Sequence, residues 1–168
     1  MSTHYAGVGS RETPQPILSY FTQLAVHFES CGMTLRSGGA PGADSAFEQG
    51  VKSLKQIFLP WSMFSCNPSP FYEPPIVAYD IASAFHPTWD RLPLAVRRLM
   101  ARNSQQVLGP NCNEPSLFVV CWTKDAAGKG GTGQAIRIAN AYNIPVFDFG
   151  DVTSAYASMV SFIKGGKK

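Results

Sequence analysis

The sequence lacks several patterns that would place it in a well-known class. Its cysteines, Cys31, Cys66, Cys112 and Cys121, are far apart and none belongs to a CxxC pair. This spacing predicts neither a metal site nor a disulfide framework. No apolar stretch approaches the roughly 20 residues that cross a bilayer, and the first residues show no charged segment followed by an apolar one. We therefore expect a cytoplasmic protein in a reducing compartment, with no membrane partner.

The chain also lacks a long basic run. Its net charge is only +3 over 168 residues, and the lysines and arginines are scattered. A duplex-DNA binder is therefore not favoured by composition. Because 45% of the residues are apolar, the chain can bury one continuous core. We expect a single domain over residues 1–164, followed by a polar tail at 165–168.

What is present is an alternation of short apolar runs with helical patterns. Apolar runs at 4–8, 33–36, 56–59, 117–122 and 145–149 predict strands, and helical spacing of apolar residues predicts helices at 17–28, 46–51, 94–107, 136–141 and 154–163. This order predicts an α/β fold, a Rossmann-like three-layer sandwich with a mostly parallel central sheet. Residues 60–93, rich in proline and aromatic residues, are expected to form an insertion with at most short helices.

Three strand-to-helix junctions, at 7–13, 37–44 and 128–133, are rich in Gly, Ser and Thr. In a parallel sheet such junctions share the carboxyl edge, where ligands bind. Glycine lets the backbone approach a ligand, and the free N–H groups of the next helix favour an anion such as phosphate. None of the three junctions has the spacing of a P-loop or of the GxGxxG motif, so neither a standard ATPase nor a dinucleotide dehydrogenase is indicated.

The junction residues resemble the SLOG superfamily, which groups the DprA/Smf DNA-processing proteins, the LOG cytokinin phosphoribohydrolases and the YpsA/YspA-type nucleotide sensors. The run from Ala6 to Arg11 is similar to its opening GSR strand, and the run from Ser37 to Asp44 to its SGGAxGAD turn. Arg102 and Asn103 resemble the RN pair of the sensor branch. The run from Gly130 to Gly133 is similar to the GGxGT phosphate turn of LOG and DprA members.

The resemblance and the turn chemistry together define a set of candidate ligand-binding residues. Backbone N–H groups, hydroxyls and the Arg11 guanidinium would hold phosphate, and Trp61 would stack on a base. The candidates are Gly9, Ser10, Arg11, Thr13, Ser37, Gly38, Gly39, Ala40, Asp44, Trp61, Arg102, Asn103, Gly130, Gly131, Thr132 and Gly133.

One departure from the LOG pattern bears on catalysis. Three residues after the threonine of the phosphate turn, LOG hydrolases carry a glutamate, whereas this chain has Ala135. Glu12, Asp44 and Glu48 remain as substitute carboxylates for cleaving an N-glycosidic bond. We therefore expect no catalytic residue and no cofactor.

The resemblance implies a phage-type member that binds a signalling nucleotide without turnover. As a lone SLOG domain, the chain resembles members found in phage genomes and in conflicts that use nucleotide signals. Such members bind ADP-ribose or other NAD-derived molecules. The expected role is that of an anti-defence sponge or sensor for a linear or cyclic ligand. The alternatives are a LOG-like N-glycosidase, which would release a free base, and a DprA-like single-stranded DNA binder. A dimer or tetramer is expected through the terminal helix.

Overall fold

The computed structural model describes residues 3–166 and forms one parallel sheet of five strands. The strands are β1 (His4–Gly7), β2 (Thr34–Ser37), β3 (Lys55–Ile57), β4 (Val119–Cys121) and β5 (Val146–Asp148). The helices are α1 (Gln15–Ser30), α2 (Ala43–Gln49), α3 (Ile76–Phe85), α4 (Leu94–Leu108), α5 (Gly130–Ala141) and α6 (Val152–Gly165). Each of the predicted strands and helices is therefore present, with bounds that differ by a few residues.

The sheet has the order β3-β2-β1-β4-β5, and every paired strand runs parallel to its neighbour. The predicted Rossmann-like α/β sandwich is confirmed, and its sheet is parallel throughout. Chain order reverses between β1 and β4, because β1 leads outward to β2 while β4 pairs on its other side. A crevice at the carboxyl ends of these two strands is the usual ligand position in open α/β sheets.

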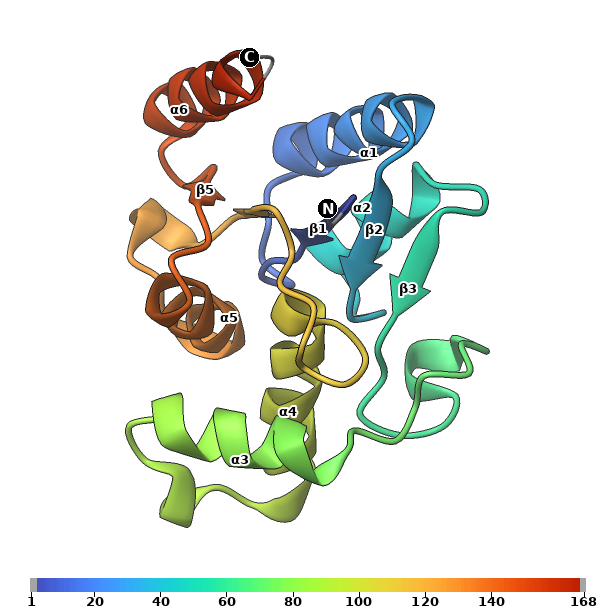
Figure 1. The fold of residues 1–168 in the computed structure, drawn as a ribbon, viewed down its shortest axis with the longest axis vertical. Coiled ribbons are helices and arrows are strands. Elements are labelled where there is room, and N and C mark those ends of the chain that lie inside the picture. Colours follow the sequence, from blue (N-terminus) through green and yellow to red (C-terminus); the bar gives the residue numbers. More distant parts are fainter. Residues whose placement is uncertain (1–2, 167–168) are drawn as a thin grey trace.

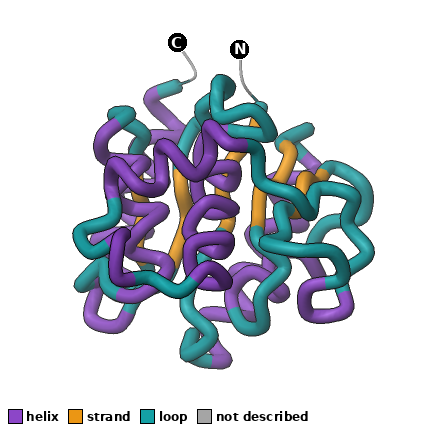
Figure 2. Tube along the Cα trace, turned by 90° about the horizontal axis from the view of Figure 1, so that it is seen from below, coloured by secondary structure: helices purple, strands orange, loops and turns teal. Residues whose placement is uncertain are grey.

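Side chains alternate across the strands and build a core on each face of the sheet. Tyr5 and Val120 belong to a cluster with residues of α1, α2 and α6, whereas Ala6 and Val119 pack with residues of α4 and α5. Figure 1 shows α1 and α6 near each other on one side and α4 and α5 on the other. Viewed from the α3 side, helices lie in front of the strands (Figure 2).

The insertion at 60–93 is more ordered than the sequence analysis expected. It contains the ten-residue helix α3, and Ser104 of α4 donates a hydrogen bond of 3.0 Å to the Ala78 carbonyl oxygen. Gln134 of α5 donates to the Ala82 carbonyl oxygen at 2.9 Å. The helix was underestimated because three of its ten residues are alanine, so its buried contact is made by small side chains at Ala78 and Ala82. It thereby braces α4 and α5 from outside (Figure 1).

The polar tail expected at 165–168 overlaps the end of the last helix. Gly165 is the last residue of α6, and Gly166 follows it as the cap. Lys167 and Lys168 lie outside the described residues.

Candidate functional site

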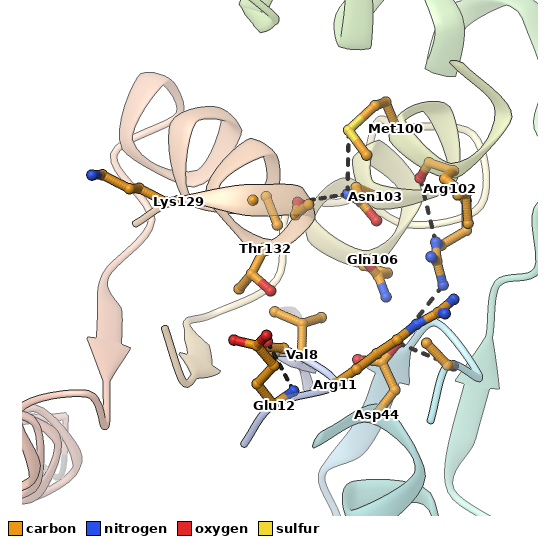
Figure 3. Close-up of a pocket in the computed structure, with 17 residues that line it drawn as sticks. Val8, Arg11, Glu12, Asp44, Met100, Arg102, Asn103, Gln106, Lys129 and Thr132 are labelled. Atoms are coloured by element: carbon orange, nitrogen blue, oxygen red, sulfur yellow. Dashed lines mark hydrogen bonds and ion pairs between the residues drawn. The ribbon is translucent and has the colours of Figure 1, made fainter. Parts of the chain in front are cut away.

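A cavity of about 460 Å³ opens at the carboxyl edge of the sheet, between the segments that follow β1 and β4. Such a volume lies within the usual range for small-molecule sites. Its walls come from the first glycine turn, the second turn, α4 and the start of α5 (Figure 3). The lining residues are Val8, Gly9, Ser10, Arg11, Glu12, Ala40, Asp44, Leu99, Met100, Arg102, Asn103, Gln106, Lys129, Gly130, Gly131, Thr132 and Ala135.

The first glycine turn is held in shape by the backbone of Ser10. Its N–H donates to the Trp122 carbonyl at 3.3 Å, and its carbonyl accepts from the Thr13 hydroxyl at 2.6 Å. The Ser10 hydroxyl accepts from the Glu12 N–H at 3.0 Å. These bonds leave Arg11 and Glu12 exposed at the cavity, with their side chains extending into it from the same turn (Figure 3).

The second turn places a buried carboxylate at the edge of the cavity. Asp44 is 4% exposed, accepts the Ala40 N–H at 3.3 Å and lies 3.7 Å from the Arg102 guanidinium. Burial raises the pKa of the Asp44 carboxyl to about 6, although Arg102 and the N–H groups of Ala40 and Gly9 oppose the shift. Near pH 6 the Asp44 carboxyl is therefore partly protonated, and in its ionised form it pairs with the Arg102 guanidinium.

Arg102 lines the cavity, and its side chain is also held by contacts with the protein. Its guanidinium donates to the carbonyls of Gly38 and Leu99 and lies 5.7 Å from the centre of the Phe64 ring. Burial lowers the pKa of Arg102 from its ordinary value, Asp44 opposes this, and Arg11 lowers it further. In Figure 3 the long side chain of Arg11 runs toward Arg102 above Asp44, so two guanidinium groups share this end of the cavity.

The third turn presents the N-terminus of α5 to the opposite end of the cavity. Lys129 is the N-cap residue of this twelve-residue helix, and its side chain makes no capping hydrogen bond within residues 3–166. The first N–H groups of α5 are therefore left for another partner. Asn103 fixes the turn by donating to the Gly131 carbonyl at 2.9 Å. At the start of the turn, the Thr123 hydroxyl accepts a hydrogen bond from the Gly128 N–H at 3.0 Å and donates one to the Asp148 carboxylate.

Between these polar ends the cavity has an apolar wall. Val8 comes from the segment after β1, Leu99 and Met100 from α4, and Ala135 from α5. Ala135 is 1% exposed and belongs to the core on this face of the sheet. A cavity with cationic or N–H-rich ends and an apolar middle can accommodate an anionic ligand that also carries a flat apolar group.

Most of the residues expected to bind a ligand line this one cavity. They are Gly9, Ser10, Arg11, Ala40, Asp44, Arg102, Asn103, Gly130, Gly131 and Thr132. They come from three separate junctions and from α4, which the strand order brings to one edge of the sheet.

Other expected residues lie outside the lining set and support it. The Ser37 hydroxyl donates to the Gly7 carbonyl at 2.6 Å, and Gly39 packs where a Cβ would lie 2.7 Å from Leu59. Thr13 bonds back to Ser10. Gly38 and Gly133 leave room for Arg102 and for the Gly128 carbonyl, respectively.

Trp61 is also outside the lining set. It is 36% exposed, and its ring meets Phe64 edge-on with centroids 5.3 Å apart. Phe64 in turn lies against the lining residue Arg102, so Trp61 is linked to the cavity wall through Phe64.

Sequence reasoning did not select seven of the lining residues for binding: Val8, Glu12, Leu99, Met100, Gln106, Lys129 and Ala135. Glu12 and Ala135 bear only on catalysis in the sequence-based prediction. Gln106 could have been found from its spacing, because it lies three and four residues after Asn103 and Arg102 and so shares their helix face.

The described part of the chain holds neither a metal-binding cluster nor a membrane-spanning helix. No group of three or more His, Cys, Asp or Glu side chains within it could hold a metal ion. None of its helices is long and apolar enough to span a membrane.

The sheet order and the cavity at its switch point define a Rossmann-like α/β protein with a ligand-sized crevice. Among solved structures, the chain is similar to DNA processing protein A from Helicobacter pylori, described for its single-stranded DNA binding mode. The TM-score is 0.61 at 20% sequence identity, over 86% of this chain and 64% of that chain. The present chain therefore spans less than two thirds of the neighbour, and the two share a fold. No protein-family model and no curated protein matches the sequence.

Proposed function

We propose that the cavity binds a phosphate-bearing nucleotide and retains it without turnover. The observation that carries this proposal is the pairing of the uncapped α5 N-terminus with Arg11 across an apolar wall. Helix N–H groups and a guanidinium bind phosphate oxygens, and the wall accepts a base. We also propose that the chain is a SLOG member, and that its preferred ligand is NAD-derived or ADP-ribose-like, in linear or cyclic form, as in phage sponges.

Mass spectrometry of the small molecule released by heat from purified protein would test this proposal. We expect an intact nucleotide, and we expect titration calorimetry with ADP-ribose to give saturable binding. Arg11→Ala should weaken that binding at least tenfold, because a charge-assisted contact with phosphate is lost. Arg98→Ala is the matched control, since Arg98 is exposed on α4 and lies outside the lining set. Equal loss in both variants would contradict a specific phosphate site.

A LOG-like N-glycosidase is the second candidate, favoured by one observation. Two carboxylates, Glu12 and Asp44, line the cavity, and the pKa of Asp44 is raised to about 6 as a general acid requires. Glu48 is excluded from this role because it binds Lys55 at 3.0 Å and Asn67 at 2.9 Å. Incubation with AMP, NAD or ADP-ribose should release no free base if the ligand is retained. Steady release that is lost in Glu12→Gln would favour the enzyme instead.

Single-stranded DNA binding is the third candidate, because the structural neighbour is described for that activity. A strand would contact several phosphates, so its affinity should fall steeply with salt. Binding of oligo(dT) by fluorescence anisotropy at two salt concentrations tests it. Tight, salt-sensitive binding that ADP-ribose fails to displace would favour DNA over a small nucleotide.

We further propose self-association through α6. Ala155 and Met159 of this helix are buried in the chain's own core, whereas Tyr156, Phe162 and Ile163 are 53%, 39% and 37% exposed. Apolar side chains on one exposed helix suit a contact with a second copy. Analytical ultracentrifugation is the test, and a mass equal to one chain at micromolar concentration would contradict this proposal.

A further inference from the structure

Gln106 presents a buried side-chain amide to the cavity. The residue is 2% exposed, yet among residues 3–166 its amide makes no hydrogen bond. In Figure 3 the amide end points into the space between Asn103 and Arg11. The amide atoms are open to the cavity and are not among the fully buried, unpartnered atoms of the described residues. A ligand that displaces water from them loses free energy unless it replaces the bonds to water. The cavity is therefore arranged so that a ligand supplies both a donor and an acceptor at this position.

Asn103, three residues earlier on the same face of α4, has a fixed orientation. Its amide nitrogen donates to the Gly131 carbonyl at 2.9 Å and faces the Met100 sulfur at 4.0 Å. The side-chain oxygen of Asn103 is consequently the atom left for a ligand, and an oxygen only accepts. In Figure 3 Asn103 and Gln106 lie next to each other above the cavity.

We propose that Asn103 and Gln106 recognise the edge of a nucleobase that carries an amino group beside an acceptor ring nitrogen, as adenine does. The amino group donates to the amide oxygens, and the Gln106 nitrogen donates to the ring nitrogen. Val8, Leu99 and Met100 supply the apolar surface on which the ring packs. This inference rests on the proposed function, and it assigns the two side chains that would recognise the adenine base of such a ligand.

Phosphate is a poorer partner for this amide. Phosphate oxygens only accept, so they would use the Gln106 nitrogen and leave its oxygen buried without a donor. The α5 N-terminus and Arg11 already provide donors and charge for an anion. An edge with one donor and one acceptor satisfies both atoms of Gln106 together.

The experiment is calorimetric titration of the full chain and of Gln106→Met with AMP, IMP and ribose 5-phosphate. The unmodified protein should bind AMP about tenfold more tightly than IMP, whose oxo group offers an acceptor where adenine has its amino donor. Gln106→Met should lower the affinity for AMP about tenfold and leave ribose 5-phosphate unchanged. Without ligand the variant should melt no lower than the parent protein, because the lost amide had no partner.

Gln105→Met is the matched control on the same helix. Gln105 donates to the Pro110 carbonyl at 3.0 Å and lies outside the lining set, so this variant should lower the melting temperature and leave the AMP to IMP ratio unchanged. Equal affinities of the parent protein for AMP and IMP would overturn the base-edge assignment. The assignment would also be overturned if Gln106→Met bound AMP with unchanged affinity, or if its affinities for AMP and ribose 5-phosphate fell equally. Absence of binding by AMP and ribose 5-phosphate alike would instead remove the nucleotide site itself.

Discussion

The second and third glycine turns look alike in the sequence but differ in why they contain glycine. In the second turn a Cβ on Gly38 would meet Arg102, Gln106 and, at 2.7 Å, Asp44, while a Cβ on Gly42 would lie 2.7 Å from the Ser10 carbonyl oxygen. In the third turn a Cβ on Gly130 would meet nothing within 4 Å. A Cβ on Gly131 would meet only the Met100 methyl group, at 3.6 Å.

Packing therefore explains the glycines of the second turn, and a positive φ of 72° explains Gly130, whereas neither reason applies to Gly131. The space above these two residues is the cavity itself. A ligand that approaches the α5 backbone supplies the missing reason for a residue without a side chain. The comparison separates glycines that allow the protein to pack from glycines that allow a ligand to approach.

Gly42→Ala should produce the largest change in stability. Gly42 has φ of 92°, which side chains rarely adopt, and its Cβ would contact the backbone of the first turn. We expect the free energy of unfolding to fall by about 3 kcal/mol. Urea denaturation measures it, with Gly131→Ala as the control that should change stability by less than about 0.5 kcal/mol. Similar losses in both variants would remove the distinction between the two turns.

Gly131→Val should show the opposite profile. A branched side chain here would fill the space in which phosphate approaches α5, so we expect affinity for AMP to fall at least about tenfold. The loss comes from steric blocking, because Gly130 is the residue of this pair with positive φ, at 72°. Calorimetry measures the affinity, and a melting curve close to that of the parent protein excludes unfolding as the cause. Unchanged affinity would place the ligand elsewhere.

Thr123→Val tests how the third turn is supported. Thr123 is 3% exposed and joins the Gly128 N–H to the Asp148 carboxylate, so its loss leaves both groups without that bond. We expect a stability loss of about 1 kcal/mol and a weaker phosphate site. Chemical denaturation and AMP titration give the two values. A fall in stability with full affinity would show that the turn keeps its shape without Thr123.

A change of pH should give the smallest effect, and it acts through the second turn. The carboxyl of Asp44 has its pKa raised to about 6, so lowering the pH through this value removes a negative charge beside Arg102. Affinity for an anion should then rise by roughly threefold. ADP-ribose is the suitable ligand because its diphosphate stays ionised in this range, and uncharged adenosine is the control. If the affinities for ADP-ribose and adenosine changed equally with pH, Asp44 would be excluded as the group that causes the change.

The α/β fold with parallel strands and the position of the site at the carboxyl edge could be predicted because they depend on local patterns. Apolar runs such as the one at 117–122 are followed by glycine turns, and parallel strands place all such turns at one edge. The burial of Asp44 and Arg102 could not be predicted in this way. It depends on α4 crossing the second turn, a contact between residues 58 positions apart in the chain.

The roles within the glycine turns were also beyond the sequence. Ser37 and Ser10 have the same hydroxyl, but the first donates to Gly7 inside the core and the second lines the cavity. Trp61 carries the aromatic ring that stacking requires, yet its ring meets Phe64. Residue type specified the chemistry that was available, and tertiary packing decided which side chains reached the cavity.

The pairing of β1 with both β2 and β4 has a consequence for how the chain is made. During synthesis β1 emerges first, but its second neighbour follows more than a hundred residues later, since Ala6 pairs with Val119. Until then one edge of the nascent β1–β2–β3 sheet stays open, and open edges are where unfinished chains aggregate. The crevice between β1 and β4 is also completed only at that late stage, so a ligand selects for finished molecules and does not assist the earlier steps of folding.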